Sequence, residues 1–453
     1  MNKNINKLFA PISLPIIFFI AAIIAGTILL HGSFSNQSTE ISWIDAFFTA
    51  TSAVCVTGLT VVDTGNIFTQ TGQTILLFLI QLGGLGIMTF SSLAFYLVKK
   101  KVSLTDRITV GQNLLYDSKF HLGKFLVQLI AVTLSIEVIG ALILIVLEPY
   151  NFSPFSALFH SISAFCNAGF SLYSDSLTRF KGDWPVNLTF MALIILGGVG
   201  FAVIVEGKSI LWSLLKRKGR GIKSSWHFGI VIKTSLFLVG IGWLYLYFAE
   251  FISYKKYLPF HEAALTSLFQ SVTCRTAGFN TLDISSMTNA SLVFMIFLMF
   301  VGGAPGSCAG GIKVTTFRAL SGFIWNQIKG REQVVIGSYA VDKESINKSL
   351  TLLFFSLVII FGCVIALDFT EGGDIPHTQA RGYFLEILFE AVSAFGTVGL
   401  SAGLTAKLSP IGKIIVIFLM FVGRLGPLVL LGSLQSFRTK LVYSRPEEKL
   451  SIG

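Results

Sequence analysis

The chain has 453 residues, of which 53% are hydrophobic and only 13% are charged. A soluble protein of this length needs more charge on its surface, so the composition excludes a soluble globular protein and indicates an integral membrane protein. The formal net charge of +11 does not indicate nucleic-acid binding, because most lysines and arginines fall in the N-terminus, three loops and the C-terminus on one predicted face. This asymmetry predicts a multi-pass protein of the plasma membrane, in contact with lipid, with both termini cytoplasmic.

Eight apolar runs follow one another along the chain, and each is long enough for a helix of about 20 residues to cross a bilayer. They lie near residues 11–31, 73–98, 124–147, 186–206, 229–249, 290–317, 349–368 and 412–434. The first run follows Lys3 and Lys7 as in a signal peptide, but it is too long for one, and we interpret it as a retained helix. The predicted fold class is an all-α polytopic membrane protein with eight transmembrane helices.

Four shorter segments, near residues 43–55, 155–166, 261–274 and 383–395, cannot cross a bilayer. Each runs into a loop of small residues that contains a glycine. We interpret the segments as re-entrant pore helices, because irregular backbone at membrane depth is tolerated only where it is buried in protein or lines a water-filled cavity. A pore helix whose C-terminus points at such a cavity favours a cation there.

The four loops are predicted to form a potassium selectivity filter. Glycine reaches the backbone conformations that turn carbonyl oxygens inward, and a ring of carbonyl oxygens replaces the hydration shell of K+. The threonine side chains either add hydroxyl ligands or brace the loops. The predicted K+-binding residues are Val56, Thr57, Gly58, Asn167, Ala168, Gly169, Thr276, Ala277, Gly278, Thr397, Val398 and Gly399.

The order helix, pore helix, loop and helix occurs four times. The loop glycines are about 110 to 120 residues apart, and repetition at such a long period indicates four pseudo-symmetric units around a central pore. The predicted units span residues 1–105, 106–220, 221–345 and 346–453. Each second helix carries a small-residue cluster, at 83–86, 197–200, 302–305 and 423–426. One cluster would favour close helix packing, whereas four clusters in register favour a shared role at the pore.

The third unit is predicted to contain a gate. A run of Gly, Ala, Ser, Cys and Pro cannot hold a stable helix, so the helix must break at mid-membrane depth, where a flexible loop can obstruct the pore. Arg424 occupies the matching cluster of the fourth unit, either as a barrier to cations or as a structural clamp between helices. The spacing before Lys313 misses the phosphate-binding pattern, so no nucleotide is expected there. The predicted gate residues are Gly302, Gly303, Ala304, Pro305, Gly306, Ser307, Cys308, Ala309, Gly310, Gly311, Lys313 and Arg424.

Arg275 lies close to the third loop glycine and would oppose cation binding if it faced the ion. We therefore expect it to point behind the loop and to pair with a carboxylate such as Glu262 or Glu390. The alternative is that its side chain extends outward along apolar surface.

These features resemble the Trk/Ktr/HKT superfamily of potassium transporters, most closely the membrane subunits (KtrB) of bacterial Ktr potassium uptake systems. The resemblance covers residues from about 10 to 440 and includes the loop glycines, the sequence Gly-Gly-Ile-Lys-Val-Thr-Thr at 310–316, and Arg424. In plant relatives a serine in the first loop accompanies sodium preference, so Gly58 implies potassium. The resemblance further implies a homodimer with one pore per subunit, uptake that depends on Na+ as a coupling or activating ion, and a cytosolic ring of nucleotide-binding regulatory subunits of the KtrA/KtrC type.

Two other functions compete with potassium uptake. A sodium or non-selective monovalent cation pathway would use the same scaffold and differ at the filter, where four glycines favour potassium. A membrane-embedded enzyme would need converging catalytic groups, but the chain has no His-Glu-x-x-His motif and Glu137 is isolated. The five cysteines have no metal-site spacing, and no covalently bound cofactor is expected.

Overall fold

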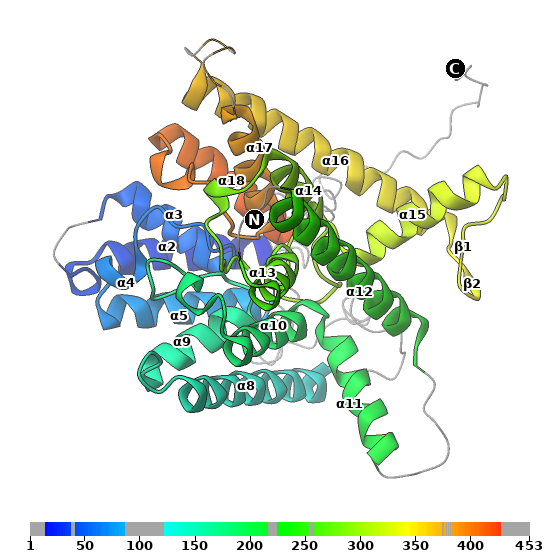
Figure 1. Ribbon diagram of the computed structural model, residues 1–453, viewed down its shortest axis with the longest axis horizontal. Helices are drawn as coiled ribbons and strands as arrows, with labels where there is room; N and C mark the ends of the chain where they lie inside the picture. Colours follow the sequence, from blue (N-terminus) through cyan, green and yellow to red (C-terminus); the bar gives the residue numbers. More distant parts are fainter. Residues whose placement is uncertain are drawn as a thin grey trace, which may run out of the picture.

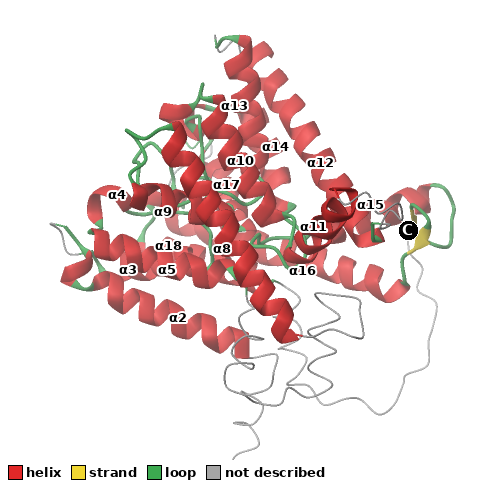
Figure 2. Ribbon diagram, turned by 90° about the horizontal axis from the view of Figure 1, so that it is seen from below, coloured by secondary structure: helices red, strands yellow, loops and turns green. Residues whose placement is uncertain are grey.

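The computed structural model describes residues 14–37, 41–86, 122–215, 224–253, 258–373, 376, 378, 380 and 382–426. The described chain is mainly helical, and its strands β1 (Val335–Ile336) and β2 (Tyr339–Ala340) form one antiparallel hairpin. In Figure 1 the chain runs around the centre of the molecule, from α3 and α5 through α8 and α12 to α16. Both views place the hairpin at the edge of the molecule (Figures 1 and 2).

The α-helices of the first half are α2 (Leu14–His31), α3 (Trp43–Val54), α4 (Thr64–Ile67), α5 (Gln70–Gly84), α8 (Leu122–Leu147), α9 (Pro154–Phe165), α10 (Trp184–Gly198) and α11 (Phe201–Leu215). Those of the second half are α12 (Trp226–Leu246), α13 (Phe260–Thr273), α14 (Asn289–Phe300), α15 (Val314–Ile328), α16 (Lys343–Leu367), α17 (Tyr383–Gly396) and α18 (Pro410–Leu425). Short 3-10 turns cover Ser33–Ser35, Thr178–Phe180, Ile284–Ser286 and Thr405–Lys407, and π-helical turns extend α12 over Tyr247–Ser253 and α16 over Asp368–Gly372.

Within the described residues, three helical stretches are long and apolar enough to cross a membrane: Val127–Leu147, Trp226–Ile252 and Lys343–Gly372. A fourth crossing is obtained if α10 and α11 are counted together, although they are bent by 110°. The expected runs 73–98 and 412–434 extend beyond the described residues. The count of eight crossings therefore stays a prediction.

The four short segments expected to be pore helices form α3, α9, α13 and α17, and we keep the name pore helices for them. Serine side chains cap the first two, because Ser42 accepts a hydrogen bond from the Asp45 amide and Ser153 accepts one from the Ser156 amide. Each of the four helices places a fully buried phenylalanine and then a buried polar residue in its middle. These pairs are Phe48–Thr49, Phe159–His160, Phe269–Gln270 and Phe389–Glu390.

The same contacts recur where the long helices meet the pore helices. α2, α8, α12 and α16 pack on α3, α9, α13 and α17 respectively. In the first three of these pairs a glycine of the long helix faces the residue that follows the buried polar residue. A Cβ atom on the glycine would lie against the side chain of that residue, at Gly26 with Ala50, Gly140 with Ser161 and Gly242 with Ser271.

Contacts between successive parts of the chain close into a circle. α5 packs on α9, α10 packs on α13, and α14 packs on α17. α18 then packs on α3, so that the last described helix meets the first pore helix. The ion pair between Lys413 Nζ and Asp45 Oδ1, 2.6 Å long, joins the same two helices.

The glycine clusters interrupt helices in the second unit as well as in the third. The expected break at 302–311 is confirmed, because α14 ends at Phe300 and α15 begins at Val314. The expected continuous helix 186–206 is wrong, since the chain bends at Gly200, which has φ 86°. A positive φ also occurs at Gly86 and Gly426, the last residues of the first and fourth clusters, and at Gly306, which follows the third cluster. Only glycine adopts this conformation without a side-chain clash, so the final glycine of the first, second and fourth clusters ends its helix, whereas α14 already ends at Phe300.

Candidate functional site

Four glycines of different loops meet at one place in the molecule; we call Gly58, Gly169, Gly278 and Gly399 the ring glycines. A Cβ atom on the first would lie 3.0 Å from the Cα atom of the second, and one on the second would lie 2.9 Å from the Cα atom of the third. A Cβ atom on the third would lie 3.4 Å from the Cα atom of the fourth, and one on the fourth would lie 3.0 Å from the Cα atom of the first. The contacts close in sequence order, and side chains have no space there.

The carbonyl oxygen of the residue before each ring glycine lies against the ring glycine of a neighbouring loop. The carbonyl oxygen of Ala168 lies beside Gly58, and that of Ala277 lies beside Gly169. The carbonyl oxygens of Val398 and Thr57 lie beside the third and fourth ring glycines in the same way. Each loop thus presents a backbone oxygen toward a neighbouring loop, which is the ligand type that coordinates a dehydrated alkali cation.

The loops have a strained backbone conformation, which contacts with the pore helices hold in place. The residue two before each ring glycine has a left-handed conformation although it carries a side chain: φ is 55° at Val56, 58° at Asn167, 72° at Thr276 and 49° at Thr397. Such residues cost free energy and persist where the surrounding structure fixes them, often at functional sites. The amide of the next residue bonds back to its pore helix, for example from Thr57 to the Ser52 carbonyl oxygen at 2.8 Å.

Three hydroxyl groups beside the ring have no hydrogen-bond partner in the described structure. They are the Oγ1 atoms of Thr57, Thr276 and Thr397, and all three residues are fully buried. Buried polar atoms normally find partners. None of the three hydroxyls therefore braces its loop through a hydrogen bond within the described residues.

A cavity of about 360 Å³ opens on one side of the ring. It is lined by the ring glycines and includes the carboxylates of Asp63 and Asp283. Both carboxylates also cap short turns, because they accept hydrogen bonds from the amides of Gly65 and Ser285. Their charge raises the cation concentration in the cavity.

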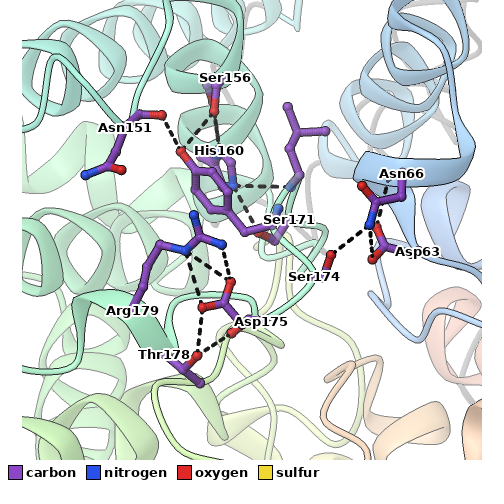
Figure 3. A network of polar contacts seen from close by, with 12 residues as sticks. Asp63, Asn66, Asn151, Ser156, His160, Ser171, Ser174, Asp175, Thr178 and Arg179 are labelled. Atoms are coloured by element: carbon purple, nitrogen blue, oxygen red, sulfur yellow. Dashed lines mark hydrogen bonds and ion pairs between the residues drawn. The ribbon is translucent and has the colours of Figure 1, made fainter.

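Polar contacts fix the loop that follows the second ring glycine (Figure 3). Arg179 Nη2 donates to Asp175 Oδ1 at 2.6 Å, and this hydrogen bond lowers the pKa of Asp175 below its usual range. Asn66 Nδ2 donates to Ser174 Oγ at 3.1 Å and so joins this loop to the one after the first ring glycine. The outer loops are therefore tied to one another as well as to their pore helices.

The residues between α14 and α15, which we call the bridging segment (residues 301–313), lie against the inner ends of the loops. A Cβ atom on Gly310 would clash with Thr397 Oγ1, and one on Gly302 would lie 3.5 Å from Thr276 Cγ2. The amides of Ala304 and Cys308 donate to carbonyl oxygens of the second cluster, at 2.9 and 3.1 Å.

Two cationic side chains, the buried Arg424 and the partly buried Lys313, hold the bridging segment in place. Arg424 donates to the carbonyl oxygens of Cys308 and Gly83, and Lys313 Nζ donates to the carbonyl oxygen of Ala309. Cys308 Sγ also donates to the carbonyl oxygen of Gly84 at 2.9 Å. Through these bonds the segment contacts the clusters of all three other second helices.

The expected carboxylate partner of Arg275 is wrong. Arg275 is buried, as expected, but its Nη2 atom donates to the carbonyl oxygen of Gly302 at 3.0 Å. Glu390 instead accepts hydrogen bonds from Ser401 and Thr405. The interruption of the third helix leaves the Gly302 carbonyl oxygen free to accept this bond, while Arg275 Nη1 is buried without a partner among the described residues.

The sequence analysis missed the acceptors of the bridging segment. These are the backbone carbonyl oxygens of Gly84, Gly197 and Gly198, in the first two glycine clusters. The available signal was the last glycine of each cluster, which ends the helix and leaves carbonyls without intrahelical partners.

Comparison with known proteins agrees with these features. The family described as TrkH, cation transport protein, matches residues 11–435. The chain is 40% identical to the Ktr system potassium uptake protein B of Bacillus subtilis, over 93% of this chain and 92% of that protein. It is 35% identical to the potassium/sodium uptake protein NtpJ of Enterococcus hirae, over 100% and 99%. The crystal structure of the potassium transporter TrkH from Vibrio parahaemolyticus has the same fold, with a TM-score of 0.75 and 21% identity over 94% of this chain and 85% of that one. The chain therefore belongs to the TrkH family of cation transport proteins, and it is a transporter rather than an enzyme.

Proposed function

We propose that this chain is the potassium-translocating membrane subunit of a Ktr-type potassium uptake system in the plasma membrane. The closed contact of the four ring glycines, with a carbonyl oxygen beside each, carries the proposal. The chain is also 40% identical to a relative named as a Ktr potassium uptake protein.

In this proposal the four loops form the selectivity filter, and four pseudo-symmetric units with eight crossings surround it. Carbonyl oxygens such as those of Thr57 and Ala168 replace the water around K+. The threonine hydroxyls add ligands on the inner side. Close backbone contact and strained φ values support a rigid filter, because loops without room for side chains cannot easily change their spacing.

The bridging segment is the proposed gate. It lies against Thr276 and Thr397, and so across the inner end of the filter. Its hold on the closed position depends on Arg424, whose guanidinium group also places a positive charge beside the path of the cation. Opening must break the bonds from Arg424 to Cys308 and Gly83.

The proposal extends to the assembly. The chain works as a homodimer with cytoplasmic termini, and a cytosolic ring of nucleotide-binding subunits of the KtrA/KtrC type controls the gate. Na+ acts as a coupling or activating ion. The relationship to proteins named as parts of Ktr systems supports this arrangement.

A sodium or non-selective cation transporter on the same scaffold is the second candidate. A relative 35% identical over the whole chain is named as a potassium/sodium uptake protein. The two candidates differ in selectivity alone, so they are separated by measuring both ions on one protein.

The test is K+ and Na+ flux into liposomes that contain the purified chain, wild type beside Gly58→Ser. A side chain at position 58 would collide with the second loop, and the backbone there has φ 90°, which residues with a side chain rarely adopt. We therefore expect the K+/Na+ flux ratio to fall about tenfold, or about 1.4 kcal/mol. The matched control is Gly240→Ser in α12, where a Cβ atom would meet nothing within 4 Å.

Folding is monitored for both variants by gel filtration and thermal unfolding. A folded Gly58→Ser protein with an unchanged flux ratio would place the pore elsewhere. Equal K+ and Na+ flux in the wild type would favour the non-selective alternative.

A further inference from the structure

One polar side chain recurs at the same register in the four pore helices. These residues are Thr49, His160, Gln270 and Glu390, each directly after a buried phenylalanine and each itself buried. In two cases the side chain bonds the residue two positions after a ring glycine. His160 Nε2 lies 3.1 Å from Ser171 Oγ, and Glu390 Oε2 accepts from Ser401 Oγ at 3.0 Å.

The hydrogen bonds of His160 determine its protonation state. The backbone amide of Leu172 donates to Nε2 at 3.3 Å, so Nε2 carries no proton. Nδ1 lies 2.8 Å from the carbonyl oxygen of Ser156, which can only accept, so Nδ1 carries the proton. His160 is therefore the neutral tautomer with hydrogen on Nδ1.

The imidazole ring lies among aromatic side chains, one of which belongs to the loop that it bonds (Figure 3). Tyr173 stacks on it with ring centroids 4.8 Å apart, and the Tyr173 hydroxyl donates to the carbonyl oxygen of Asn151 at 2.6 Å. The guanidinium group of Arg179 lies over the Tyr173 ring, 4.3 Å from the ring centroid, and forms an ion pair with Asp175. The remaining ring neighbours of His160 are Phe152, Phe159 and Phe190.

No described carboxylate bonds His160 directly. The charged and titratable groups around it are Tyr173, Arg179 and Asp175, and the last is already held by the arginine. A proton added to Nε2 would point at the Leu172 amide and remove the acceptor that holds the loop. The two residues after the ring glycine, Phe170 and Ser171, would then lose a fixed neighbour.

We propose that His160 is a positioning residue for selectivity, which holds the second filter loop only while its imidazole is neutral. Acid on the outer side therefore weakens K+ selectivity. The inference rests on the proposed function, because it assigns His160 to the loop of Gly169. It adds a residue and a pH dependence that the ring itself does not contain.

The experiment compares His160→Phe and His160→Gln by K+/Na+ flux ratio in liposomes, with the outer pH lowered from about 7.5 to about 4 so that acid reaches the imidazole. His160→Phe keeps a flat ring but has no acceptor, and we expect its flux ratio to fall about fivefold at neutral pH, the size of one lost hydrogen bond. His160→Gln retains an oxygen acceptor, so it restores the ratio and removes the acid sensitivity of the wild type.

The matched control is His31→Phe. His31 also stacks on an aromatic ring, that of Trp43 at 3.8 Å, and its Nδ1 atom lies 2.8 Å from the carbonyl oxygen of Ile41. It lies at the end of α2, so its replacement changes stability without changing the flux ratio. This control separates a general loss of packing from a loss of selectivity.

Two results would overturn the inference: a folded His160→Phe protein with wild-type selectivity, or acid sensitivity that persists unchanged in His160→Gln. If Gly58→Ser lowers the flux ratio while His160→Phe does not, the filter stands and only the role of His160 fails. If neither variant changes the ratio, the proposed function fails with it.

Discussion

Three threonine hydroxyls beside the ring glycines are buried without a hydrogen-bond partner in the described structure. A buried polar group in this state costs about 1–3 kcal/mol. The chain bears this cost at Thr57, Thr276 and Thr397, in three of its four loops. Stability alone would favour valine, which has the same shape. Thr133 Oγ1 is buried in the same state, so the missing partner alone assigns no role; the proposed coordination of a cation at the ring is what distinguishes these three hydroxyls and is open to test.

We expect Thr57→Val to separate function from stability. The variant loses no protein hydrogen bond, so its thermal unfolding temperature should equal or exceed that of the wild type. It removes one oxygen from the ion path, so half-maximal K+ flux should require a K+ concentration higher by about threefold to tenfold. Thr133→Val is the control, because Thr133 Oγ1 in α8 is also buried and unpartnered. Equal K+ dependence in the two variants would contradict the ligand role.

For single residues, the sequence predicted the positions of the loop glycines better than the partners of the charged side chains. Glycine with a fixed backbone task is recognisable because no other residue adopts the conformation cheaply. Arg275 was assigned a carboxylate partner, whereas its partner is the carbonyl oxygen of Gly302. Every residue carries a backbone carbonyl, so the sequence does not mark which one accepts a hydrogen bond. A rule that pairs charged residues with charged residues therefore cannot identify these partners. The same reason hid the partners of Cys308.

Among the elements, the short helices were predictable and the long helices were less so. The expected segments 43–55 and 383–395 correspond to α3 and α17 within one or two residues at each end. Their lengths, apolar composition and terminal loops agree with one another, and such agreement between signals makes a segment readable. The interruption at Gly200 was not predicted, because the mean hydropathy of the run stays high across the glycines of the cluster at 197–200, although its last glycine can end a helix.

The bridging segment offers a prediction at the level of an element. Shortening residues 304–309 removes the carbonyl oxygen that Arg424 bonds and the amide groups that bond the second cluster. The segment then no longer reaches across the ring, and we expect basal K+ flux in liposomes to rise at least about tenfold, which corresponds to about 1.4 kcal/mol in favour of the open state.

A point variant tests the same element without changing its length. Gly303→Ala would place a Cβ atom 2.6 Å from the carbonyl oxygen of Gly198 and should push the segment off the second cluster. Gly229→Ala in α12, where a Cβ atom meets nothing within 4 Å, is the control. Lost or unchanged flux in both folded gate variants would mean that the segment is structural.

For the whole molecule, the order of helix contacts explains how one chain builds a closed ring. α5 packs on α9, and equivalent contacts continue until α18 packs on α3. The repeated sequence features predicted equivalent units, but the closing contact joins helices far apart in the chain and has no local signal. In the structure this closing contact includes an ion pair between Asp45 in the first pore helix and Lys413 in the last described helix.

This ion pair gives the last prediction, a double-mutant cycle with Asp45→Asn and Lys413→Met. The side chains of Asp45 and Lys413 are only 21% and 15% exposed, so solvent screens them less than a surface pair, and we expect a coupling free energy of about 1–2 kcal/mol. The control is the pair of Glu344 and Lys348, which is also 2.6 Å long but 75% and 61% exposed, with an expected coupling of about 0.3–0.5 kcal/mol. Because the ring closes between the fourth and first loops, each single variant should also lower the K+/Na+ flux ratio, and the double variant should lower it by less than the product of the two. Strictly multiplicative effects on both stability and selectivity would mean that ring closure does not depend on this contact.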